Sequence, residues 1–208
     1  MALLEPKDDR RFLEKAQAAM SNWRERMVPL ESPDRDPIQP QYAMRAIDRL
    51  ASDDAILSTD SGTIATWVAR HYDIRGDREF LLSGNLATMA PGLPYAIAAQ
   101  NAYPGRQCIA FVGDGGFAML MAEFLTAARY ELPIKVFICN NGLYGQILWE
   151  QMVLASRSSA CGGSGGPTSC PGLSRAAAGG SGLTAPRTSR RPWPRPWRSR
   201  DRRWWTLR

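Results

Sequence analysis

Asp114 lies in the run Gly113-Asp114-Gly115-Gly116, where an apolar stretch gives way to an amphipathic one. Glycines let a backbone approach another group closely, and a carboxylate among them suggests a bound cation. A polar pair, Asn140-Asn141, follows Gly115 after twenty-four intervening residues. The glycine loop and a helix N-terminus favour a bound anion. The carboxylate of Asp114 would repel a bare phosphate, but a divalent metal between the carboxylate and the phosphate removes that repulsion. These residues therefore predict a phosphate-binding loop that also holds Mg²⁺.

Four similar units surround this loop, each with a short apolar strand, a loop of glycine or small polar residues, and a helix. The predicted strands are 55–60, 80–83, 108–112 and 134–139, and the predicted helices are 63–71, 93–102, 117–130 and one from about 146. Near-continuous apolar strands that alternate with helices predict an α/β fold with a doubly wound parallel sheet. In such sheets, ligands bind beyond the carboxyl ends of the strands.

Lengths along the third unit predict where Asp114 and Asn141 meet. Helix 117–130 travels roughly 21 Å at ~1.5 Å per residue, and strand 134–139 returns about 20 Å at ~3.3 Å per residue. The two residues should therefore end at the same edge of the sheet, on neighbouring parallel strands. The spacing of apolar residues predicts that the helix buries one stripe, made of Phe117, Leu120, Met121, Phe124, Leu125 and Ala128.

Two more helices are predicted before the sheet. Residues 8–26 form an amphipathic pattern whose stripe contains Phe12, Ala16, Ala19, Met20 and Trp23. A proline-rich loop follows, and Pro40 can start a helix that buries Ala43, Ala46, Ile47 and Leu50. The chain then divides into a linker helix and loop (1–38), a ligand-binding domain (39–154) and a tail (155–208).

The tail has a composition of its own. The whole chain carries a net charge of +6, but residues 155–208 alone hold eleven Arg and one Asp, so the first 154 residues are net acidic. The tail lacks Lys, Glu, Ile, Val, Phe and Tyr and shows no helical or strand periodicity, which predicts disorder. A frame slip in a GC-rich gene, a natural flexible tail, and an Arg/Trp segment that binds nucleic acid or a membrane surface are the alternatives.

Other features narrow the class. There is no apolar run long enough for a membrane span, and the N-terminus lacks the apolar segment of a signal peptide, so a cytoplasmic location is expected. The chain has one histidine and no CxxC spacing among its four cysteines, which argues against a Cys/His metal site.

The full motif set carries a family resemblance. The runs LSTDSGT, GNLATMAPGLPYAIAAQ, GDGG and NNGLYGQILWEQM resemble the C-terminal cofactor domain of thiamine-diphosphate-dependent enzymes. The likeness covers about residues 8–153 and is greatest to the branch of pyruvate oxidase, quinone-dependent pyruvate dehydrogenase and acetolactate synthase. It implies thiamine diphosphate and Mg²⁺ as cofactors.

Roles for individual residues follow from that resemblance. It implies that the side chains of Asp114 and Asn141 and the backbone carbonyl of Leu143 bind the metal. Met89 would support the bent cofactor, and Gln146 and Glu150 would approach the substrate. The full cofactor-binding set is Gly62, Thr63, Ala87, Thr88, Met89, Asp114, Gly115, Gly116, Asn141, Gly142, Leu143, Tyr144, Gly145, Gln146 and Ile147.

The resemblance also implies an activity. Enzymes of this kind decarboxylate a 2-oxo acid such as pyruvate, and the product is oxidised or transferred to an acceptor, as in acetolactate formation. They need a glutamate that protonates the aminopyrimidine ring, which comes from a separate N-terminal domain, usually of a partner subunit in a homo-oligomer. This chain is therefore expected to be a fragment or split subunit with no catalytic residue of its own, inactive alone, and without the domain's last strand and helix.

Two other functions compete with this hypothesis. One is a nucleic-acid or membrane-surface binding protein that acts through the Arg/Trp tail, whose affinity would fall steeply with salt. The other is a generic dinucleotide-binding domain. Against the latter, Ala118 stands where the strict glycine pattern has its third glycine, and Asn140-Asn141 stands where an acidic ribose-binding residue is expected.

Overall fold

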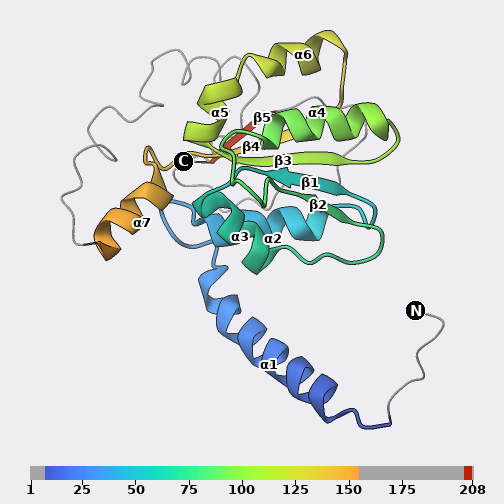
Figure 1. The fold of residues 1–208 in the computed structure, drawn as a ribbon, viewed down its shortest axis with the longest axis vertical. Coiled ribbons are helices and arrows are strands. Elements are labelled where there is room, and N and C mark those ends of the chain that lie inside the picture. Colours follow the sequence, from blue (N-terminus) through green and yellow to red (C-terminus); the bar gives the residue numbers. More distant parts are fainter. Residues whose placement is uncertain (1–7, 155–203, 208) are drawn as a thin grey trace.

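A computed structural model describes residues 8–154 and 204–207, and its centre is a parallel β-sheet (Figure 1). The strands are β1 (Ile56–Thr59), β2 (Glu79–Leu81), β3 (Cys108–Gly113), β4 (Lys135–Cys139) and β5 (Trp204–Leu207), in the spatial order β2-β1-β3-β4-β5. The helices are α1 (Arg11–Met27), α2 (Pro40–Leu50), α3 (Thr63–His71), α4 (Gly92–Ala102), α5 (Asp114–Leu120), α6 (Glu123–Arg129) and α7 (Gly145–Val153), with a 3₁₀ turn η1 (Val28–Leu30). The predicted α/β class with a parallel sheet is confirmed.

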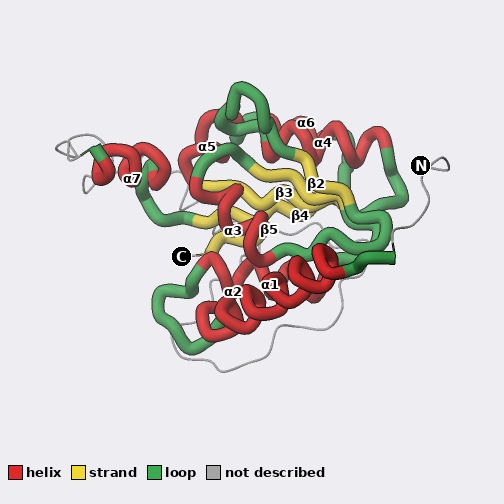
Figure 2. The backbone as a smooth tube through the Cα atoms, turned by 60° about the horizontal axis from the view of Figure 1, so that its bottom comes forward, coloured by secondary structure: helices red, strands yellow, loops and turns green. Residues whose placement is uncertain are grey.

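Helices cover both faces of the sheet (Figure 2). Alternate residues of β3 point to opposite faces, as the pleat of a strand requires. Ile109 and Phe111 join the core under α2 and α3, while Ala110 and Val112 join the core under α4, α5 and α6. A strand that is apolar on both sides reads as a continuous hydrophobic run, which explains why the sequence pattern identified it.

The crossover between β3 and β4 brings Asp114 and Asn141 to one edge. The two strands pair in parallel with Gly113 opposite Cys139, so the loops that follow them leave the sheet side by side. This confirms the expectation drawn from the lengths of the helix and the returning strand.

The helix predicted over 117–130 is divided into α5 and α6. At the break, the N–H groups of Phe124 and Leu125 donate to the carbonyls three residues earlier, Met121 (3.1 Å) and Ala122 (2.9 Å), instead of four. The tighter turn rotates α6 relative to α5. The predicted buried stripe is therefore wrong beyond Phe117, since Leu120, Met121 and Leu125 are exposed. Phe124 is only half-buried, and Ala127 is buried instead of Ala128.

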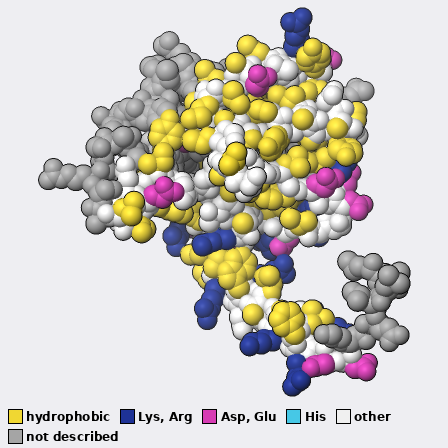
Figure 3. Space-filling model, viewed as in Figure 1, with side chains coloured by type: hydrophobic (Ala, Val, Ile, Leu, Met, Phe, Trp, Pro, Cys, Tyr) yellow, Lys and Arg dark blue, Asp and Glu magenta, His cyan; other side chains and the backbone are white. Residues whose placement is uncertain are grey.

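The N-terminal helices differ in how they pack. In α2, Ala43 and Ile47 are buried as predicted, but Met44 and Asp48 complete the buried face, while Ala46 and Leu50 are only half-buried. Helix α1 projects from the body and buries none of its residues, so its apolar side chains show as yellow patches along it (Figure 3). No helix in the described ranges is both long and apolar enough to cross a membrane.

β5 corrects the prediction that residues 155–208 contain no strand. Trp204–Leu207 pairs in parallel with β4, and the register of the two backbones places Val136 opposite Trp204 and Cys139 opposite Leu207. Tryptophan and threonine favour the extended backbone, and the edge of β4 offers unpaired backbone groups. The predicted disorder of the tail and its Arg/Trp binding surface fall mainly on 155–203 and 208, outside the described residues.

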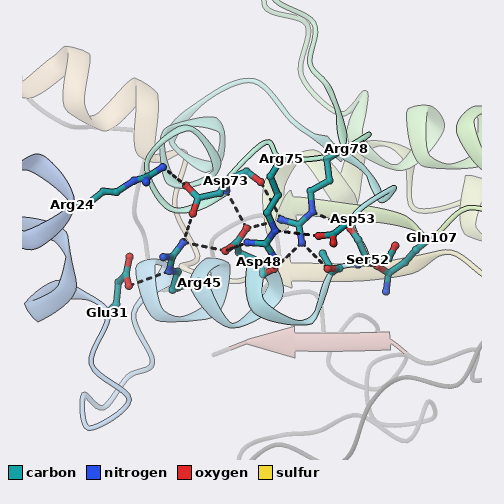
Figure 4. A network of polar contacts seen from close by, with 11 residues as sticks. Arg24, Glu31, Arg45, Asp48, Ser52, Asp53, Asp73, Arg75, Arg78 and Gln107 are labelled. Atoms are coloured by element: carbon teal, nitrogen blue, oxygen red, sulfur yellow. Dashed lines mark hydrogen bonds and ion pairs between the residues drawn. The ribbon is translucent and has the colours of Figure 1, made fainter. Parts of the chain in front are cut away.

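A network of ion pairs and hydrogen bonds connects the segments that precede β1 and β2, at the amino ends of these strands (Figure 4). The buried guanidinium of Arg78 donates to Asp48 Oδ1 (2.8 Å) and to the backbone carbonyls of Ser52 (2.9 Å) and Ala51 (2.6 Å). Asp48 is itself buried and also contacts Arg45 (3.0 Å). This polar cluster stabilises the edge of the sheet opposite to the predicted ligand site.

Candidate cofactor-binding site

A cavity of about 660 Å³ lies at the carboxyl edge of the sheet. Its walls come from the loops after β1, β3 and β4, from the segment before α4, and from the start of α7. The predicted residues that line it are Gly62, Thr63, Ala87, Met89, Asp114, Gly115, Gly116, Asn141, Leu143, Tyr144, Gly145, Gln146, Ile147 and Glu150. Thr88 and Gly142 do not line it. The N–H of Thr88 turns to Ser83 Oγ (3.3 Å).

Asp114 links two of the loops. It is the first residue of α5 and is buried, and its Oδ2 accepts the backbone N–H of Gly142 at 3.2 Å. The same N–H lies 3.2 Å from Asn140 Oδ1, and Gly142 adopts a φ of +65°, which glycine tolerates without strain. Asn141 Oδ1 accepts the N–H of Leu143 at 3.0 Å. The three predicted metal ligands therefore come from loops that contact each other directly.

The chemistry of these donors fits a hard divalent cation. Asp114 offers a carboxylate, Asn141 an amide oxygen and Leu143 a backbone carbonyl, and Mg²⁺ prefers oxygen ligands of these kinds, completing its shell with phosphate and water. Asp114 also stands at a helix N-terminus beside Gly115 and Gly116, where backbone N–H groups attract an anion. The residues present fit a metal-bound diphosphate.

Glycines let the loops pack closely. A Cβ added at Gly115 would lie 2.8 Å from Tyr144 Cε1, and one added at Gly145 would lie 3.1 Å from Thr63 Oγ1. Gly62 has a φ of +120°, a conformation that is strained for any residue with a side chain. The loops after β1, β3 and β4 thus pack closely, with the glycine of one loop against a side chain of another.

Helix α7 forms one wall and has no buried residue. On it, Gln146 Nε2 donates to Glu150 Oε1 at 3.2 Å, and both residues line the cavity. Trp149 contacts Trp67 of α3 edge to face, with ring centroids 6.4 Å apart. This aromatic pair connects α7 to the body of the domain.

Sequence reasoning missed Asp60 and the segment 37–40, which also line the cavity. Asp60 follows β1 and is 3% exposed. Burial raises the pKa of its carboxyl to about 6, although the backbone N–H groups of Gly92 and Gly113 act to lower it. A signal was present, since Asp60 is the charged residue that ends the apolar run AILST at the ligand edge. Segment 37–40 gave no such signal.

Cys139 lies at the end of β4 beside the same site. Burial, with a smaller contribution from the charge of Asp114, raises the pKa of its thiol to about 12. The thiol is therefore neutral at physiological pH and acts as a small apolar group.

Comparison with known proteins places this cavity in a family. Residues 60–190 match the C-terminal thiamine pyrophosphate (thiamine diphosphate) binding domain of thiamine pyrophosphate enzymes. The chain is 44% identical over 150 residues to the Bacillus subtilis (strain 168) protein YdaP, whose name describes it as thiamine pyrophosphate-containing, and the match covers 72% of this chain and 26% of that protein.

Two enzymes are also similar. The pyruvate oxidase of Lactiplantibacillus plantarum is 37% identical over 134 residues, which cover 64% of this chain and 22% of the enzyme. The acetolactate synthase large subunit of Lactococcus lactis is 37% identical over 128 residues, which cover 61% of this chain and 22% of the enzyme. The matched part of this chain thus spans about a quarter of the length of these relatives.

Proposed function

The chain belongs to the thiamine pyrophosphate enzymes, and we propose that it binds thiamine diphosphate together with Mg²⁺ in the cavity at the carboxyl edge of its sheet. Asp114, Asn141 and the carbonyl of Leu143 hold the metal in this proposal. Gly115, Gly116 and the loop 142–147 hold the diphosphate, while Ala87 and Met89, which line the cavity, face the pyrimidine end.

One observation carries the proposal most directly. Asp114 Oδ2 accepts the N–H of Gly142, which fixes the loop after β3 to the loop after β4 at one end of the cavity. The family match covers both loops, because it spans residues 60–190. Oxygen atoms that can bind a metal and backbone N–H groups that can bind an anion therefore lie together. A metal ion and a diphosphate would neutralise each other's charge there.

The remaining residues orient the cofactor and limit water. Thiamine diphosphate, when bound, supplies the electron sink that decarboxylation of a 2-oxo acid requires. Met89 is part of the cavity wall and would press on the middle of the cofactor. Gln146 and Glu150 reach the cavity from α7 and would contact the substrate.

Isothermal titration calorimetry tests cofactor binding. The purified chain should bind thiamine diphosphate when Mg²⁺ is present, and EDTA should abolish the heat signal. Asp114→Ala should weaken binding by about a hundredfold, the effect of losing a charged metal ligand worth about 3 kcal/mol. Asp54→Asn is the matched control, since it removes an exposed carboxylate at the amino edge of the sheet and should leave binding unchanged. Wild-type affinity in Asp114→Ala would refute this metal site.

We further propose that the chain is the cofactor-binding part of an enzyme that decarboxylates and oxidises a 2-oxo acid such as pyruvate, or forms acetolactate. Its similarity to pyruvate oxidase and acetolactate synthase supports this, as does the quarter of their length that it spans. The glutamate that serves the pyrimidine ring would then come from another domain or from a partner chain in a homo-oligomer. Purified alone with both cofactors, pyruvate and an artificial electron acceptor, the 208 residues should release no CO₂. Measurable release would show that no partner is needed.

A further inference from the structure

Asp60 lies between the two ends of the proposed site. It follows β1 and is buried to 3% exposure, and its Oδ1 accepts the N–H of Gly92, the first residue of α4, at 2.9 Å. Its Oδ2 is fully enclosed and makes no hydrogen bond of regular geometry among the described residues, although the backbone N–H of Gly113 acts on the carboxyl group. A buried carboxylate with one poorly satisfied oxygen lowers the free energy of unfolding. The position of Asp60 therefore suggests a role other than stability.

Asp60 Oδ2 lies against the loop after β3. A Cβ added at Gly116 would come within 2.1 Å of Asp60 Oδ2 and 2.7 Å of its Cγ. On the other side, a Cβ added at Gly92 would lie 3.0 Å from Oδ1. The carboxyl group is thus wedged between two glycines, with one oxygen toward each loop.

The segment 87–91, which precedes Gly92, has a strained backbone that contacts from other segments must stabilise. Ala87 has a φ of +50° and Ala90 a φ of +67°, both in the left-handed region that alanine disfavours. The segment also contains Met89 and ends at Gly92, whose carbonyl accepts the hydroxyl of Ser58 at 2.6 Å. Gly92 is therefore fixed through its N–H by Asp60 and through its carbonyl by Ser58, two side chains of the β1 region.

From this arrangement we propose that Asp60 is a positioning residue that keeps the 87–91 segment in register with the loop 113–116. The proposal rests on the proposed function, because these segments would contact the pyrimidine and diphosphate ends of one cofactor. Asp60 needs to touch neither end. It fixes the separation between them, so that the metal-bound diphosphate and the support from Met89 act on the same molecule.

Comparing the affinities of two ligands distinguishes a positioning role of Asp60 from a purely structural one. Thiamine diphosphate needs the 87–91 segment as well as the loops 113–116 and 142–147, whereas inorganic pyrophosphate with Mg²⁺ needs only the two loops. Asp60→Ala should weaken thiamine diphosphate binding by about tenfold or more, and pyrophosphate binding by less than about threefold. Asp60→Asn keeps the Oδ1 acceptor for Gly92 and should bind both ligands within about threefold of the wild type.

A double-mutant cycle tests the wedge itself. Gly116→Ala alone should weaken thiamine diphosphate binding because its methyl group collides with Oδ2. In the Asp60→Ala background, the methyl group has room, so the same change should cost much less. Additive losses would refute the contact between the loop and the carboxyl group.

Titration of all variants by calorimetry, with far-UV circular dichroism to establish folding, distinguishes the outcomes. If Asp60→Ala does not fold, Asp60→Ser takes its place with the same expected losses. Equal weakening of both ligands, or wild-type affinity for thiamine diphosphate in the folded variant, would overturn the positioning role while leaving the proposed function intact. Absence of thiamine diphosphate binding in the wild-type protein would instead overturn both.

Discussion

Replacing Asp60 by asparagine should change how the stability of the cofactor-free protein depends on pH. Burial raises the pKa of this carboxyl from 3.8 to about 6 in the folded state. The folded protein therefore holds the proton more tightly than the unfolded chain does. The stabilisation from protonation is fully present below the unfolded value and is lost as pH rises through the folded value.

The structure sets the size of the effect. A difference of about two pKa units corresponds to about 3 kcal/mol in the free energy of unfolding at ~1.4 kcal/mol per unit. Between pH ~7.5 and pH ~5, the part recovered is about 1.4 kcal/mol, because the folded carboxyl titrates near 6 and the unfolded one does so mostly below this interval. The amide that Asp60→Asn introduces cannot titrate, so the wild type should gain about 1.4 kcal/mol relative to this variant on acidification.

Urea unfolding followed by far-UV circular dichroism measures this gap. Both proteins are unfolded near pH ~7.5 and near pH ~5 in EDTA without cofactor, and the change in their difference cancels other titrating groups. Asp54→Asn, which removes an exposed carboxylate at the amino edge of the sheet, is the matched control for the loss of one carboxylate. A gap between wild type and Asp60→Asn that stays constant with pH would refute the reasoning, because Asp60 would then titrate like an exposed aspartate.

Two further predictions concern the framework of the site. Gly142→Ala should lower the free energy of unfolding by about 1–2 kcal/mol, because Gly142 has a φ of +65°, whereas Gly84→Ala, at a position with no close neighbour, should change it little in the same urea assay. Arg78→Met should destabilise the protein by about 3–5 kcal/mol, because it leaves Asp48 buried and without its closest guanidinium, and adding Asp48→Asn should recover part of that loss in thermal unfolding.

The sequence predicted the parts of the fold that depend on local pattern. Each apolar run became a strand within one or two residues, since strands buried on both faces admit few polar side chains. The spacing between Asp114 and Asn141 predicted their meeting because the rise per residue of helices and strands is fixed. Local pattern predicted the helix bounds less well where the backbone departs from a regular helix. The break between α5 and α6 is a local change to hydrogen bonds between residues three apart, and the periodicity of 117–130 did not predict it.

The candidate site divides in the same way. The sequence by itself determined which residue types stand at the ligand edge, because a glycine loop with Asp114 and a spaced Asn140-Asn141 pair keep their chemistry in any α/β fold of this connectivity. Only the tertiary structure decided that Asp60 would be buried between Gly92 and Gly116, and that segment 37–40 would close the cavity. Those contacts join residues that are 32 and 56 positions apart from Asp60. Burial and contact at such separations arise when several segments pack together, so no single stretch of the chain carries them.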